Sequence, residues 1–162
     1  MFRLAAAFVF ALSLLPAACA DALPEPKDTP PPMTFRTAPL VIETKSGAHR
    51  FAVEVAETPE QRERGLMFRD AMAGDAGMIF DYHQDVEISM WMKNTILPLD
   101  MVFISADGTV FDVVKGAVPY SLDIIPSGGR VRAVLEVNAG IVDALEIRRG
   151  DKVKNEIFGN AP

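Results

Sequence analysis

The segment Leu99–Ile104 constrains the fold more than any other part of the chain. Its alternating positions are apolar on both faces, apart from Asp100. A half-exposed strand alternates polar and apolar side chains, whereas a strand covered on both faces does not. The segment therefore predicts a central, buried strand. Because an unpaired buried charge is strongly unfavourable, another protein group or a ligand must satisfy the Asp100 carboxylate.

Short apolar runs separated by turn residues make up most of the chain. Asp107-Gly108 predicts a hairpin after Leu99–Ile104, while Lys45-Ser46-Gly47 and Ser127-Gly128-Gly129 mark further turns. Together these signals predict a mainly β (α+β) fold, a compact antiparallel barrel or sandwich of about eight short strands. The predicted strands cover residues 40–43, 50–55, 78–80, 88–92, 99–104, 109–114, 131–137 and 152–158.

The strand predicted at 131–137 has an alternating pattern. Arg130, Arg132 and Glu136 alternate with apolar side chains, which predicts that one face of this strand meets solvent. Val134 falls on the same predicted exposed face.

Two short helices are predicted between the strands. The first starts at Thr58 as N-cap, followed by Pro59 and by Gln61, which completes a capping box, and it ends at Gly65. The second covers about 139–145, with Asn138 as its cap.

The N-terminal residues predict export. Residues 1–20 resemble a secretory signal peptide, with an apolar run at 4–15 followed by small residues. Cys19, the only cysteine, is either removed with the signal or lipidated at an imperfect lipobox. The proline-rich segment 21–38 predicts a linker or disordered leader, and 39–159 a single β-rich domain. The expected location is the periplasm or envelope, as a soluble or lipid-anchored protein.

The charge of the chain bears on its partners. The formal net charge is −6, which disfavours nucleic acid and anionic membrane surfaces as partners. A membrane is expected to be contacted only through a lipid on Cys19.

A dense group of polar residues among apolar ones precedes the buried strand. Trp91, Lys93 and Asn94 lie close to Asp100 in sequence, separated by a turn. One interpretation is structural: Lys93 pairs with Asp100 across a hairpin, and Asn94 bonds the turn backbone. The other is functional: the four residues edge a ligand pocket, with Trp91 as its wall and Lys93 as an anion anchor.

The chain resembles the exported members of the domain of unknown function 192 family, also called the uncharacterised UPF0127 group. The resemblance covers residues 39–158 and implies a small β-rich fold without an established activity, substrate or cofactor. Its motifs are Gly65-Leu66-Met67 with Arg69, Gly77-Met78-Ile79-Phe80, Met90-Trp91-Met92-Lys93-Asn94-Thr95, Pro98-Leu99-Asp100 with Phe103, Leu135-Glu136 with Gly140, and Gly150-Asp151.

Three further charged residues, Arg69, Glu136 and Asp151, are carried over by the resemblance. An arginine–carboxylate pair among them would tie loops to the sheet. Glu136 with Asp100 or Asp151 would alternatively supply the carboxylates of an envelope enzyme acting on a polymer or sugar.

Methionines suggest a third function. Soft thioethers bind Cu(I), although spacing places most of these side chains among core residues. The histidines His49 and His83 lack zinc spacing, so no other metal and no cofactor is predicted. The methionines concerned are Met67, Met72, Met78, Met90, Met92 and Met101.

The sequence best supports a non-enzymatic, exported domain that binds a small molecule, a glycan or a protein partner. The carboxylate enzyme and the copper-handling protein remain alternatives.

Overall fold

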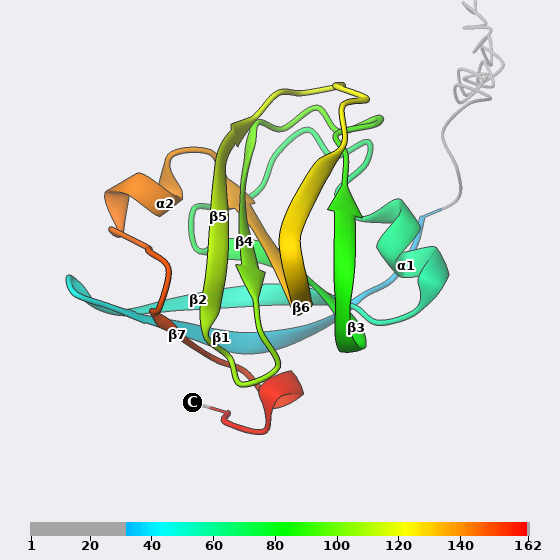
Figure 1. The fold of residues 1–162 in the computed structure, drawn as a ribbon. Helices are drawn as coiled ribbons and strands as arrows, with labels where there is room; N and C mark the ends of the chain where they lie inside the picture. The colour runs from blue at the N-terminus through cyan, green and yellow to red at the C-terminus, as the bar shows by residue number, and fades with distance from the viewer. Residues whose placement is uncertain (1–31, 162) are drawn as a thin grey trace, which may run out of the picture. The chain divides into compact units, whose positions relative to one another are not determined.

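A computed structural model describes residues 32–161, which form a single curled sheet of seven strands (Figure 1). The strands are β1 (Arg36–Thr44), β2 (Gly47–Ala56), β3 (Ala76–Met90), β4 (Leu99–Ile104), β5 (Val110–Ala117), β6 (Ile125–Asn138) and β7 (Lys152–Lys154). The helices are α1 (Pro59–Arg64), α2 (Ile141–Ala144) and a 3-10 turn at Glu156–Phe158.

The sheet has the order β5-β4-β6-β3-β2-β1-β7. Its neighbouring strands are antiparallel except for β2 and β3, which are parallel because α1 carries the chain back between them. The two ends of the sheet meet at a bridge between Thr109 and Lys152, supported by Val153 N–H donating to the Gly108 carbonyl at 2.7 Å. The sheet thus curls into a half-barrel, which confirms the predicted mainly β fold with two short helices.

Two predicted strands are one strand in the structure. The runs 78–80 and 88–92 both belong to β3, which pairs with the equally long β6. The predicted turn Ser127-Gly128-Gly129 lies inside β6, so this prediction is wrong. Here the β3–β6 register shifts, and the Ser127 hydroxyl accepts a hydrogen bond from Ile88 N–H at 3.1 Å. Such a bulge bends a long strand without ending it.

The sheet carries an apolar core on each face. On β4, Val102 and Ile104 join the core that includes Val142 of α2, here called the α2-side core. Met101 and Phe103 join the core that includes Leu66, just after α1, here called the α1-side core. All six β4 residues are buried, as the sequence predicts.

The helix ends follow different chemistry. Thr58, Pro59, Gln61 and Gly65 take the predicted positions at α1, and both bonds of the capping box are present. For α2 the predicted cap is wrong: Gly140 is the N-cap and makes no side-chain bond. The Asn138 amide instead donates to the carbonyls of residues 72 and 73.

The N-terminal predictions concern mostly other residues. The signal peptide and Cys19 lie outside the described residues 32–161. Strand β1 begins at Arg36, so residues 36–38 of the predicted linker belong to the sheet. Within 32–161 no helix has the length and apolar character needed to cross a membrane.

Candidate functional site

The buried Asp100 is fully occupied by backbone amides. Its side chain is 1% exposed, and Oδ1 accepts from Gly116 N–H at 2.8 Å. Oδ2 accepts from Gly140 N–H at 2.9 Å and Val142 N–H at 3.0 Å. Asp100 therefore supplies the N-terminal cap that α2 lacks locally and joins it to β4 and β5.

The predicted Lys93–Asp100 pair does not form. Lys93 is exposed, and its Nζ lies 5.1 Å from the centre of the Trp91 ring. Asn94 has a left-handed backbone (φ 54°), and its Nδ2 lies 4.0 Å from the Met67 sulfur rather than on the turn backbone. These residues form a surface loop because the amides of distant residues already satisfy Asp100.

A cavity of about 320 Å³ lies in the α1-side face, here called the α1 pocket. Helix α1 and the residues after it form one wall, and β3 with the loop after it forms the other. It is lined by Pro59, Arg62, Glu63, Arg64, Gly65, Leu66, Met67, Phe80, Tyr82, Ser89, Met90, Trp91, Thr95 and Glu136. Trp91 is thus the one residue of the predicted pocket edge that lines this pocket.

Glu136 on β6 is the buried acid of this pocket. It is 4% exposed and lies opposite Met78 of β3 and Met101 of β4. No residue in 32–161 donates a hydrogen bond or forms an ion pair with its carboxyl group. Since every fully enclosed side-chain oxygen in that range has a partner, the Glu136 oxygens must reach the pocket space. Burial raises the pKa of Glu136 to about 8, so the group is protonated at neutral pH.

Two neighbouring residues, Glu136 and Arg62, affect the pKa of Tyr82 in this pocket. Burial raises the pKa of Tyr82, the Arg62 guanidinium opposes this, and the Glu136 charge adds to it. The Tyr82 hydroxyl donates to the Met90 sulfur at 3.8 Å, and Arg62 lies 4.9 Å from the ring centre. The pocket thus combines one uncharged acid, hydroxyl groups and apolar walls.

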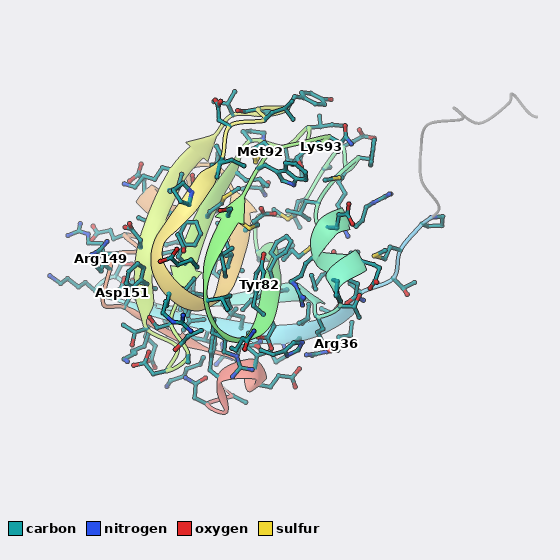
Figure 2. The ribbon with its side chains drawn as sticks, turned by 45° about the vertical axis from the view of Figure 1, so that its right-hand side comes forward. Arg36, Tyr82, Met92, Lys93, Arg149 and Asp151 are labelled. Carbon is teal, nitrogen blue, oxygen red and sulfur yellow. The ribbon has the colours of Figure 1, made fainter. Side chains whose placement is uncertain are left out.

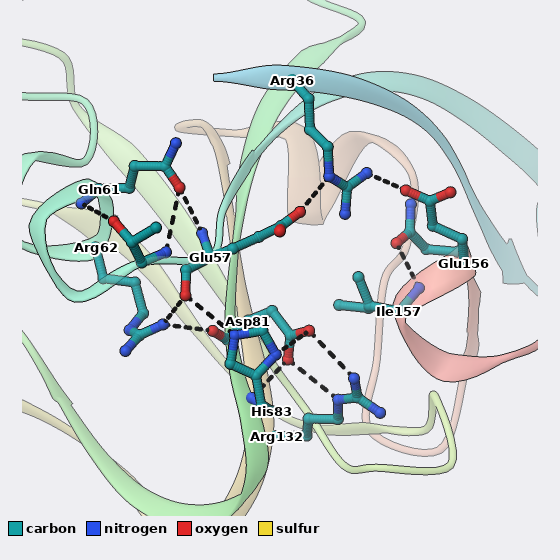
Figure 3. Close-up of polar contacts among 11 residues, drawn as sticks. Arg36, Glu57, Gln61, Arg62, Asp81, His83, Arg132, Glu156 and Ile157 are labelled. Carbon is teal, nitrogen blue, oxygen red and sulfur yellow. Dashed lines mark hydrogen bonds and ion pairs between the residues drawn. The ribbon is translucent and has the colours of Figure 1, made fainter. Parts of the chain in front are cut away.

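A polar network around Asp81 holds the α1 wall of the pocket against β3 (Figure 3). Asp81 is 3% exposed and accepts two bonds from Arg132, both at 3.1 Å, and one from His83 N–H at 2.8 Å. Although burial acts in the opposite direction, these partners lower the pKa of Asp81. Arg62 donates to the carbonyls of Asp81, at 2.8 Å, and Glu57, which ties α1 to β3.

Neither Asp81 nor Arg132 was predicted as a site residue. Asp81 directly follows the apolar run 78–80, and this was the available signal of a buried acid. Its partner Arg132 is 51 residues away, and the sequence pattern predicted that Arg132 faces solvent.

Residues 41–155 match the DUF192 family, described as uncharacterized ACR, COG1430. The chain belongs to this family. This confirms the resemblance to the domain of unknown function 192 family, and the family description assigns no activity to its members.

Two solved structures are similar to this DUF192 chain. One, named a "putative transcription regulator" of Sinorhizobium meliloti 1021, is 44% identical, has a TM-score of 0.76 and is matched over 78% of this chain and 99% of that chain. The other, a protein of unknown function from Novosphingobium aromaticivorans DSM 12444, is 35% identical, with a TM-score of 0.72 over 85% of this chain and 94% of that chain. No curated protein matches the chain.

The three charged residues Arg69, Glu136 and Asp151 do not form one network in this DUF192 domain. Arg69 pairs with Glu54 of β2 at 2.5 Å, so it ties the segment after α1 to the sheet through a different acid. Asp151 accepts from Arg148 N–H at 2.7 Å and closes a surface turn. Figure 2 shows Asp151 at the side of the sheet away from Lys93.

Nor does the sheet bring the proposed carboxylate pair together. Asp100 lies opposite Val137, while its neighbour Met101 lies opposite Glu136. Because successive side chains on a strand point to opposite faces, Asp100 and Glu136 lie on opposite faces of the sheet. A two-carboxylate site built from these residues is therefore not assembled.

The methionines pack largely as core residues. Met78, Met92 and Met101 are fully buried in the α1-side core, while Met67 and Met90 line the pocket. Met72 packs against the same core. Within 32–161, no cluster of three His, Cys, Asp or Glu side chains could hold a metal ion.

Proposed function

We propose that this domain binds a small organic molecule in the α1 pocket. The observation that carries the proposal is Glu136, a buried acid without a partner among the described residues, whose oxygens reach the pocket. A buried polar group left unpaired is unfavourable, so a site that retains one gains free energy when a ligand completes its hydrogen bonds.

The size and lining of the pocket support a small ligand. A cavity of about 320 Å³ is at the lower end of the range for ligand sites, and apolar walls with a few polar groups are typical of them. Trp91 is 40% exposed at the rim and offers a ring face, beside which Lys93 lies. The proposal therefore keeps Trp91 and Lys93, and places Glu136 where the sequence suggested Asp100.

Export to the periplasm or envelope remains part of this proposal, on the strength of residues 1–20 alone. The name of the Sinorhizobium structure suggests nucleic acid as a ligand. The net charge of −6 opposes that choice, since DNA binding depends on neutralising phosphates.

Native mass spectrometry of the protein purified gently from its own cell envelope tests the proposal. We expect an added mass from an organic molecule, which Glu136→Leu and Trp91→Ala each remove. Glu87→Gln, at an exposed carboxylate outside this pocket, is the matched control and retains the added mass. Bare polypeptide from the unaltered chain, together with no binding in a fragment screen, would contradict small-molecule binding.

A protein partner is a second candidate, favoured by the exposed apolar residues. Among the described residues, four large apolar side chains of the segment 118–124 are exposed: Val118, Tyr120, Leu122 and Ile124. Tyr120 N–H donates to the Thr95 carbonyl at 3.1 Å, which places this segment beside the loop of Trp91. Exposed apolar patches mark interaction sites. The double substitution Leu122→Ser and Ile124→Ser would weaken the binding of such a partner. It would leave the added mass of the pocket ligand unchanged.

The remaining alternatives have less support. An enzyme would have to work with Glu136 as its only buried acid in the pocket, acting as a general acid or base near its pKa of about 8. Copper would have to be held by Met67 and Met90, since Met78, Met92 and Met101 are fully buried.

A further inference from the structure

We infer that the α1 pocket selects a ligand whose deepest group is uncharged and both donates and accepts hydrogen bonds, an amide being the simplest example. This inference rests on the proposed function and adds the chemical class of the ligand. It follows from the surroundings of Glu136 and from the position of the pocket's charged residues.

The first step is the state of Glu136. Glu136 is 4% exposed, and its carboxyl group has no partner in 32–161. Burial alone raises its pKa, because no nearby charge contributes. At neutral pH it presents an O–H donor and a carbonyl acceptor side by side. An amide presents the complementary acceptor and donor with the same spacing, so both hydrogen bonds can form together.

The second step is the position of the cations. Arg62 donates to the carbonyls of Glu57 and Asp81, Arg132 is bound to Asp81, and Lys93 lies over Trp91. None of these pairs with Glu136. A ligand carboxylate placed against Glu136 would therefore lose its hydration without pairing with Arg62, Arg132 or Lys93, which are already engaged.

The third step concerns a cationic ligand. An ammonium or amidinium group could pair with Glu136 only by ionising it, and burial disfavours the charged form of Glu136. An uncharged head group avoids both penalties.

The walls indicate the rest of the ligand. Leu66, Phe80 and Met90 line the pocket, and Trp91 stands at the rim. A flat apolar body between the uncharged head group and the solvent would bury its surface against these side chains.

Three probes of the same shape test the inference: benzamide, benzamidine and benzoate. They differ in head-group charge and keep that charge between about pH 6 and pH 9. Trp91 is the only tryptophan, so its fluorescence reports events at the rim, and calorimetry gives the affinity independently. At pH 6.5 we expect benzamide to bind at least about tenfold more tightly than the other two.

The pH dependence identifies the group responsible. Benzamide binding should weaken as the pH rises through about 8, where Glu136 ionises. Glu136→Gln replaces the neutral acid by an amide, so it should retain benzamide binding at pH 6.5 and lose the pH dependence. Glu136→Leu should lose binding. Glu87→Gln, the control at an exposed carboxylate outside the α1 pocket, should leave affinity and pH dependence unchanged.

The alternatives give different results. Tightest binding of benzamidine, strengthening as the pH rises, would show Glu136 acting as an anion and would overturn the inference while leaving the proposed function. Tightest binding of benzoate would do the same. No binding of any probe to a protein whose unfolding curve is normal would count against both.

Discussion

The two buried acids Asp100 and Glu136 lie on opposite faces of one sheet and have opposite surroundings. Asp100 accepts three backbone hydrogen bonds at 2.8 to 3.0 Å and faces the α2-side core. Glu136 has no partner among the described residues and faces a pocket of about 320 Å³. Burial alone therefore does not separate a structural acid from the acid proposed to bind a ligand, whereas the presence of partners does.

Replacing Asp100 should have the largest effect on stability. Asp100→Ala leaves the amides of Gly116, Gly140 and Val142 without their acceptor, and each hydrogen bond to a charged group contributes about 1.5 kcal/mol or more. We expect a loss of about 4 kcal/mol in the free energy of unfolding, measured by denaturant titration. A loss below about 1 kcal/mol would mean that water replaces these bonds.

Replacing Glu136 should instead stabilise the protein at alkaline pH. Its folded pKa of about 8 lies above the ordinary value of 4.5, so its stability contribution is complete below pH 4.5 and is lost as the pH rises through 8. Glu136→Gln should match the unaltered protein at pH 5 and exceed it at pH 8 by about 3 kcal/mol, allowing for water in the open pocket. Parallel stability curves would contradict the raised pKa.

Asp81 provides a third buried acid, paired with a side chain. Arg132→Met leaves the Asp81 carboxylate without two hydrogen bonds and should cost about 2 kcal/mol near pH 7, since Arg132 is partly exposed. Because the folded pKa of Asp81 is lowered, its contribution is present above the ordinary value of 3.8 and is lost as the pH falls through the folded pKa. Urea unfolding should therefore show a difference between the variant and the unaltered protein that shrinks as the pH falls below 3.8.

A surface pair sets the lower limit of these effects. Lys115 pairs with Asp143, whose side chains are 51% and 71% exposed. Lys115→Met should change the unfolding free energy by less than about 0.5 kcal/mol. A larger change would mean that the charge at the end of β5 contributes to the stability of the fold. It would then be wrong to rank the acidic residues by the number and burial of their bonded partners.

Local patterns predicted the local parts of the fold well. The caps of α1 at Thr58 and Gly65, the Asp107-Gly108 hairpin and the buried strand Leu99–Ile104 all depend on residues close together in sequence. Trp91, which the motif placed at a pocket edge, lines the α1 pocket, and its role in binding stays a prediction.

Contacts between distant residues could not be predicted in this way. The amides that donate to Asp100 are 16, 40 and 42 residues away in sequence. Because they satisfy the carboxylate, Asp100 does not need Lys93 as an ion-pair partner. Glu136 was placed on a solvent face because Arg130 and Arg132 alternate with apolar residues. In the structure, residues of α1 and of the segment after it line the pocket together with Glu136, and Glu136 is buried.

The central claim is that Glu136 is protonated at neutral pH while its oxygens reach an open pocket. The most direct test is a carbon-13 NMR titration of the glutamate side-chain carboxyl groups between about pH 3 and pH 10. The structure predicts one glutamate with a midpoint near 8, whose signal is absent in Glu136→Gln. Midpoints below about 5 for every glutamate would contradict the account, because an ionised Glu136 requires a partner that the structure does not contain within residues 32–161.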